Sequence, residues 1–301
     1  MRTGADMAAP ESSKEVEEQS TGKRLFLVDG SNLLFQMFFG MPARIVNAQG
    51  KAIQGTLGFT GALLKMLRMV EPTHSVVLFD GEHENARSMI DADYKANRVD
   101  YSGVPEEENP FSQIQDVYAV LDFLRIKHME TTSCEADDLI AGYALSFGSK
   151  MQVVISSLDS DFFQLITDKV SVLRYRGKNT IIYTPERILE KFGIMPDRYA
   201  DFKSLTGDTA DHIRGADKIG AKTAAALVNE FGTLENILAN AESIKRPSIK
   251  ESIIKDAGRL RRNYQLIKLE NKEPLPFDLH ELAYEYDGLT TNEVLKGIGL
   301  K

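Results

Sequence analysis

The chain has 301 residues, and 43% of them are hydrophobic, so it can form one large domain or two smaller ones with a real core. No run of about 18 apolar residues occurs, so we expect no transmembrane helix. The formal net charge of −8 argues at first against a nucleic-acid partner. The single cysteine, Cys134, excludes an internal disulfide and is typical of a reducing, cytoplasmic compartment.

Residues 1–22 are polar and rich in glutamate, with no apolar stretch. This composition excludes a secretory signal peptide, and the shortage of arginine excludes a transit peptide. We therefore expect a disordered tail, with the folded part beginning at Lys23.

Strands and helices alternate along residues 23–205. Continuous apolar runs predict buried strands at 25–29, 75–80, 153–156 and 170–175. Apolar residues at helical spacing predict helices over 55–70, 111–124 and 136–147, and a further short helix with Pro185 in its first turn. This order predicts an α/β fold with a doubly wound, mainly parallel sheet.

Two regions depart from this alternation. Residues 81–110 are a long, highly charged insertion between a strand and the next helix, and connections of this length are usually functional. From about Thr206 the pattern becomes helical, so we expect a second, all-helical region over 206–301. The segment 275–286 shows no clear pattern and stays unassigned.

Acidic residues follow the predicted strands and gather in short clusters. Nine of them are candidate metal ligands: Asp29, Asp80, Glu135, Asp137, Asp138, Asp159, Asp161, Asp208 and Asp211. Because the carboxyl ends of parallel strands meet at one edge of a sheet, we expect these side chains to converge. Each cluster alone could be an ordinary turn or helix cap, where aspartate is common. Their combination in one chain instead predicts a metal site.

The chemistry of this set narrows the function. Nine carboxylates cannot all ionise side by side without countercharge, and oxygen-only ligands favour Mg²⁺ or Mn²⁺. A pair of such ions held by carboxylates is typical of phosphodiester hydrolysis. Removing nine negative charges from −8 leaves a formal charge of +1, so the rest of the surface can carry basic patches that bind a nucleic acid.

The stretch IRGADKIGAKTAAALV, residues 213–228, places a glycine-bearing turn before an alanine-rich helix. Backbone N–H groups at such a helix start bind phosphate without reading sequence. The candidate DNA contacts are Lys218, Gly220 and Lys222. An ordinary antiparallel helix pair has the same pattern, and the position directly after GDTAD is what favours DNA binding.

The charged insertion supplies a third group of candidates. Lys95 and Arg98 are three residues apart, so we expect them to share one helix face and to stabilise charge that develops on a phosphate. Tyr94 is a candidate for stacking on a base, and Arg87 for contacting the nucleic acid. The alternative is a solvated charged surface, which is the more common meaning of a charge run.

The motifs VDGSNLLF, LFDG, YKANR, EADDLIAG, SSLDSDFFQL and GDTADHIRGADKIGAKTA occur in this order between Lys23 and Leu269. As a set they resemble the 5′-nuclease (flap endonuclease) superfamily. The most similar members are the 5′→3′ exonuclease domain of bacterial DNA polymerase I, its stand-alone homologues and phage 5′-exonucleases. The resemblance implies a PIN-like core over 23–205, with 81–110 as a helical arch, and a helix-hairpin-helix region over 206–301.

The resemblance also implies two metal sites, which would hold two Mg²⁺ or Mn²⁺ ions. The residues that resemble the first site are Asp29, Asp80, Glu135 and Asp137; those of the second are Asp159, Asp161 and Asp211, with Asp137 shared and with Asp138 and Asp208 in support. Lys95 and Arg98 stand where the arch of the family contacts the scissile phosphate. The turn at Gly220 resembles a hairpin that binds duplex DNA and often K⁺. The family commonly has glycine at the position of Lys218, where a left-handed backbone would cost lysine roughly 1 kcal/mol.

The expected function is therefore a structure-specific 5′→3′ exonuclease and flap endonuclease of DNA replication and repair. Its substrate would be DNA with 5′ ends or flaps beside a duplex. We expect a cytoplasmic monomer without membrane association, and any polymerase partner would act in trans. Two alternatives stay open: a PIN-class ribonuclease, which would lack the hairpin at 213–228, and a non-catalytic DNA-binding scaffold, for which nine carboxylates have no evident benefit.

Overall fold

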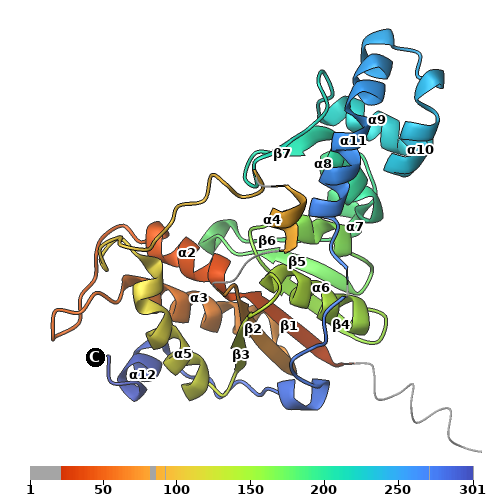
Figure 1. Ribbon diagram of the computed structural model, residues 1–301. Coiled ribbons are helices and arrows are strands. Elements are labelled where there is room, and N and C mark those ends of the chain that lie inside the picture. Colours follow the sequence, from red (N-terminus) through yellow and green to blue (C-terminus); the bar gives the residue numbers. More distant parts are fainter. Residues whose placement is uncertain (1–21, 82–85, 92, 271, 301) are drawn as a thin grey trace, which may run out of the picture.

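The computed structural model describes residues 22–81, 86–91, 93–270 and 272–300, so the predicted tail lies outside the described residues apart from Gly22. The centre of the fold is a six-stranded sheet (Figure 1). Its strands, in spatial order, are β3 (Lys127–Glu130), β2 (His74–Phe79), β1 (Arg24–Asp29), β4 (Gln152–Ser156), β5 (Val170–Arg174) and β6 (Ile181–Tyr183). All neighbours are parallel except β5 and β6, which are antiparallel. The prediction of a mainly parallel α/β sheet is confirmed.

Both faces of the sheet are covered, because successive residues of a strand point to opposite sides. Phe26 and Val28 of β1 face a layer of helices α2 (Gly30–Gly40), α3 (Gln54–Val70), α5 (Ile114–Phe123) and α12 (Thr291–Gly297). Leu25 and Leu27 face α6 (Ala136–Phe147) and the apolar core that continues into the second half of the chain. All four side chains are fully buried.

A helical lobe stands at one end of the sheet (Figure 1). Its helices are α7 (Pro185–Phe192), α8 (Tyr199–Thr206), α9 (Ala221–Phe231), α10 (Leu234–Ala239) and α11 (Pro247–Ile267). The expectation of an all-helical region after Thr206 was wrong at one place. Strands β7 (Gly207–Asp208) and β8 (Ile213–Arg214) form a short antiparallel pair between α8 and α9. Gly207 allows this pairing, because its φ is +80° and a Cβ there would lie 2.4 Å from the backbone nitrogen of Gly215.

The charged insertion is mostly turns. Its described part contains one short helix, α4 (Ala86–Ile90), before the 3-10 helix η2 (Pro110–Gln113). Lys95 has a left-handed backbone, with φ of +57°, which no helix continues through. The expectation that Lys95 and Arg98 share a helix face was therefore wrong, since both lie in consecutive turns.

The last described residues return to the sheet half of the molecule. The backbone N–H of Tyr284 donates to the carbonyl oxygen of Thr73 over 2.9 Å, after the 3-10 helix η7 (Leu279–Leu282). Leu295 and Leu300 then pack on Ile53, and Figure 1 shows α12 beside α5. None of the helices in the described ranges is long and apolar enough to span a membrane.

Candidate active site

The ends of β1 and β2 present two carboxylates that are held in place by hydrogen bonds. Asp29 caps α2, since its carboxylate accepts from the backbone N–H of Asn32 over 2.9 Å. Its second oxygen accepts from the hydroxyl of Ser157 over 2.8 Å. Asp80 accepts from the backbone N–H of Ala136 over 2.9 Å, which ties the end of β2 to the start of α6. Both carboxylates are thus oriented before any ligand binds.

These two carboxylates and two others line one pocket of about 380 Å³. The additional acids are Asp137, in the first turn of α6, and Asp159, which follows β4. Arg98 from the charged insertion lines the same pocket. The remaining lining residues are Ser31, Asn32, Phe35, Val99, Tyr101 and Phe111. We name Asp29, Asp80, Asp137 and Asp159 the first acidic cluster.

The carboxylates of the first acidic cluster are buried and repel one another when ionised. Burial raises the pKa of Asp29 to about 7, with a further contribution from Asp80. Burial and the nearby Asp159 also raise the pKa of Asp137 well above its usual range. Carboxylates under mutual repulsion, with oxygen as the only donor atom, are the ligand set that suits a hard divalent cation. The residues present therefore fit a Mg²⁺ or Mn²⁺ ion.

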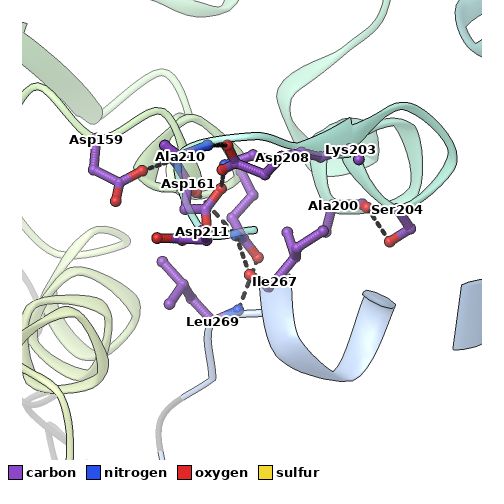
Figure 2. Close-up of polar contacts among 12 residues, drawn as sticks. Asp159, Asp161, Ala200, Lys203, Ser204, Asp208, Ala210, Asp211, Ile267 and Leu269 are labelled. Atoms are coloured by element: carbon purple, nitrogen blue, oxygen red, sulfur yellow. Dashed lines mark hydrogen bonds and ion pairs between the residues drawn. The ribbon is translucent and has the colours of Figure 1, made fainter. Parts of the chain in front are cut away.

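A second acidic cluster shares Asp159 with the first, and Figure 2 shows its residues. One carboxylate oxygen each from Asp159, Asp161 and Asp211 lie within 4.8 Å of one another. Asp161 begins the 3-10 helix η3 (Asp161–Leu165), and its backbone N–H donates to Asp159 over 2.8 Å. Asp211 lies in the turn between β7 and β8, and burial raises its pKa, with Asp159 adding to the effect. The β7–β8 pair, which sequence patterns did not predict, therefore positions Asp211 in the second cluster.

Lys203 of α8 was not singled out from the sequence. Its ammonium group forms ion pairs with both Asp161 and Asp208, and its side chain is only 6% exposed. Burial alone would raise the pKa of Asp208, yet Lys203 outweighs it and the pKa is lowered. No local pattern could have found it, because every residue of α8 except Thr206 is buried and no apolar face sets Lys203 apart.

Glu135 and Asp138 do not line the pocket that contains the first acidic cluster. Both accept ion pairs from Arg87, with a distance of 2.6 Å to Asp138, and Glu135 also pairs with Lys95. Burial alone would raise the pKa of Glu135, but Lys95 and Arg87 hold it below its usual value. Metal ligation by Glu135 and Asp138 stays a prediction.

Two of the predicted nucleic-acid contacts are buried. The ring of Tyr94 packs against Ile213, Leu266 and Ile267, and its side chain is inaccessible to a base. Arg87 is buried in its ion pairs with the acids of α6. In this structure Tyr94 packs in a small core and Arg87 neutralises acids of α6, and contact of either residue with a nucleic acid stays a prediction. Sequence reasoning could not separate them from solvated residues because their partners lie far along the chain.

Arg98 reaches the second acidic cluster, whereas Lys95 pairs with Glu135 beside the clusters. A nitrogen of Arg98 lies 3.4 Å from the carboxylate of Asp211, and its side chain, which is 54% exposed, lines the pocket. The ammonium of Lys95 pairs with Glu135 and is mostly buried. Their placement beside the clusters agrees with the expected role, which itself stays a prediction.

The predicted DNA hairpin forms an exposed turn before α9. Lys218 has φ of +64°, so lysine does take the left-handed position where glycine is common. Lys218, Gly220 and Lys222 are all exposed, and nothing lies within 4 Å of a Cβ built on Gly220. Helix α11 holds the turn in place, because its Ser252 hydroxyl donates to the carbonyl oxygen of Asp217 over 2.6 Å. A rigid, open helix start of this kind suits phosphate contacts.

Comparison with known families now decides the relationship. A family model described as 5′-3′ exonuclease, N-terminal resolvase-like domain, matches residues 24–193. A second, described as 5′-3′ exonuclease, C-terminal SAM fold, matches residues 194–288. The chain belongs to the 5′-3′ exonuclease family. The prediction of a 5′-nuclease is confirmed at this level.

Individual relatives agree with this membership. A 5′-3′ exonuclease of Aquifex aeolicus is 31% identical over 284 residues, which cover 92% of this chain and 95% of the relative. DNA polymerase I of Streptococcus pneumoniae is 33% identical over 269 residues, which cover 87% of this chain but only 30% of the polymerase. The chain thus spans about a third of the length of the polymerases that it matches.

Solved structures share the fold. T5 5′-exonuclease with bound zinc superposes with a TM-score of 0.68 at 22% identity, over 92% of this chain and 98% of the phage protein. The catalytic core of Rad2 in complex with a DNA substrate superposes with a TM-score of 0.56 at 16% identity, over 94% of each chain. Both likenesses extend over the sheet and the helical lobe, so the predicted two-part architecture is confirmed.

Proposed function

We propose that this chain is a divalent-metal-dependent nuclease that cuts DNA phosphodiester bonds at 5′ ends and 5′ flaps. The observation that carries the proposal is that two acidic clusters share one residue, Asp159. The first cluster lines a pocket together with Arg98, and Arg98 also pairs with Asp211 of the second. Adjoining oxygen sites are the arrangement that a two-metal hydrolysis needs. Family membership supports the direction of cleavage, from the 5′ end.

The ions would be Mg²⁺ or Mn²⁺. The first would be held by the first acidic cluster, and the second by Asp159, Asp161 and Asp211. When bound, two such ions activate a water molecule and stabilise the leaving oxygen. The T5 structures with bound metal ions support this assignment by analogy of fold.

The chain's own cations would act on the substrate phosphate. Arg98 stands at the mouth of the pocket and can neutralise charge that develops on a phosphate held there. Lys95, in the same segment, would contact the phosphate either while it keeps its ion pair with Glu135 or after that pair has broken. Terminal bases would unpair so that the scissile phosphate reaches the clusters, at a cost of a few kcal/mol.

The exposed turn at Lys218–Lys222 would hold the duplex beside the cut. Contacts there go to backbone phosphates, so they would position DNA without reading its sequence. Carbonyl groups of the same turn would bind a K⁺ ion. We further propose that the protein acts as a monomer in replication and repair, with a polymerase as a partner in trans; the match to polymerase I domains supports this context.

A cleavage assay tests the proposal. A 5′-labelled double-flap DNA is incubated with the protein and Mg²⁺, and product lengths are read against a blunt duplex and an RNA of the same sequence. We expect cutting near the flap base of DNA, abolished by EDTA and by Asp159→Asn. Cleavage of the RNA alone would favour a ribonuclease instead, and duplex binding without any cleavage would favour a scaffold.

A further inference from the structure

Lys203 is a buried cation that pairs with Asp161, one of the three carboxylates of the proposed second metal site. Its side chain reaches from α8 to the carboxylates of Asp161 and Asp208, as Figure 2 shows. The helix that carries it is fixed, because Tyr199, Phe202 and Leu205 are packed in the core. The ammonium is therefore held at this position by the fold.

The two acidic clusters differ in their countercharge. Over the described ranges, the carboxylates of the first acidic cluster have no lysine or arginine nitrogen at ion-pairing distance. In the second cluster, Asp161 pairs with Lys203 and Asp211 with Arg98. Among the described residues, direct ion pairs thus neutralise two carboxylates of the second cluster, whereas Lys95 and Arg98 act on the first only over longer distances.

This difference has a direct consequence for metal binding. An ion that binds Asp161 must share a carboxylate oxygen with a buried ammonium, or displace it. Two positive charges a few ångströms apart repel one another strongly where water is excluded. Displacing Lys203 would leave a buried cation that pairs with Asp208 alone, which is also unfavourable.

We propose that Lys203 is a built-in competitor for the second metal ion, which makes the second site bind a divalent cation more weakly than the first. In the same position it neutralises Asp161 and Asp208, so that the site keeps its shape without the ion. Lys203 is thus a positioning residue that sets metal affinity. This inference rests on the proposed function, because it takes the acidic clusters as metal sites.

The test is Mn²⁺ binding to the full chain without DNA, followed by calorimetry and by the spin resonance of free Mn²⁺. The variant is Lys203→Met, which keeps most of the length of the side chain and removes its charge. Lys245→Met is the matched control, because Lys245 is an exposed lysine outside both clusters. We expect two classes of site in the wild type, and a second class at least about tenfold tighter in Lys203→Met, with the control unchanged.

A second readout separates competition from simple loss of structure. In EDTA, Lys203→Met should melt at a lower temperature than the wild type, yet gain more from added Mn²⁺. If Lys203→Met does not fold, Lys203→Gln is measured in the same way. Nuclear magnetic resonance of the Lys203 ammonium in the wild type, titrated with diamagnetic Mg²⁺, gives an independent reading, since its largest shift should follow filling of the weaker class.

The outcomes distinguish this inference from the function on which it rests. The competitor role alone would be overturned if the weaker class of sites bound Mn²⁺ no more tightly in the variant than in the wild type. It would also be overturned if the ammonium signal did not change as the weaker class fills. Absence of any Mn²⁺ binding to the wild type would overturn both the role and the proposed metal sites.

Discussion

The backbone N–H of Lys95 donates a hydrogen bond of 3.1 Å to the carbonyl oxygen of Asp211. This bond joins the charged insertion to the turn that carries the late aspartates. The side chain of Asn97 strengthens the junction, because its amide donates to the carbonyl oxygens of Thr209 and Ala210 over 3.4 and 3.2 Å. The cations of the insertion and the acids of the second cluster are therefore positioned together.

Asn97→Ala should slow single-turnover cleavage by about 2- to 10-fold, which corresponds to the loss of a net hydrogen bond of about 0.5–1.5 kcal/mol. The melting temperature should change little, since Asn97 is exposed. The matched control is Asn229→Ala, whose exposed amide donates to the carbonyl of Gly193 over 2.7 Å, away from both clusters. Equal rates for the two variants would argue that the junction does not position the cations.

Asp159→Asn should abolish cleavage in Mg²⁺ and leave duplex binding largely intact, because Asp159 belongs to both acidic clusters. Rates are measured with enzyme in excess, and binding by fluorescence anisotropy without metal. Asp197→Asn, at an exposed position, serves as the control for a lost charge. Near-normal turnover of Asp159→Asn would rule out the proposed metal sites.

Lys95→Ala should reduce the single-turnover rate by about 10² or more, the scale of one lost transition-state contact. Binding of the duplex should weaken much less, since the exposed turn before α9 lies elsewhere. Stability must be measured in parallel, because Lys95 also neutralises the buried Glu135. A loss confined to binding would make Lys95 a docking residue.

Lys222→Glu should weaken binding to duplex-bearing substrates and flatten the dependence of log K on log salt concentration. Each neutralised phosphate contributes a slope of about −0.9 for duplex DNA. Cleavage at saturating enzyme should be unchanged, and so should any preference for sequence. The exposed Lys178→Glu is the control. An unaltered salt slope would make residues 213–228 an ordinary helix pair.

The metal-free protein should lose stability as pH rises from about 4 to 7. Asp29 and Asp161 each have a pKa of about 7 in the folded chain, raised from 3.8 mainly by burial. The folded state thus binds protons that the unfolded state has released, and stability declines over this range. Thermal unfolding in EDTA should show the decline, Asp29→Asn should reduce it, and Mg²⁺ at pH 8 should reverse it. A decline of equal size in Asp29→Asn would contradict the assignment.

Much of the sheet was predictable, because its central strands are continuous apolar runs and the helices between them are strongly periodic. The edge strands β3 and β6 were not predicted, because β3 has polar, partly exposed residues and β6 is only three residues long. The acids were predictable as strand-end residues. The partners Lys203 and Asn97 were not, because a buried ammonium or a bridging amide is defined by contacts with residues distant in sequence.

The path of the chain after α11 gives the helical lobe two connections to the sheet half. One runs from β6 into α7, and the other leaves Ile267 and returns to Thr73 and Ile53. A lobe tethered at both ends has little freedom to swing. A duplex bound at the turn before α9 would therefore lie at a fixed distance from the acidic clusters. That distance would determine where the strand is cut.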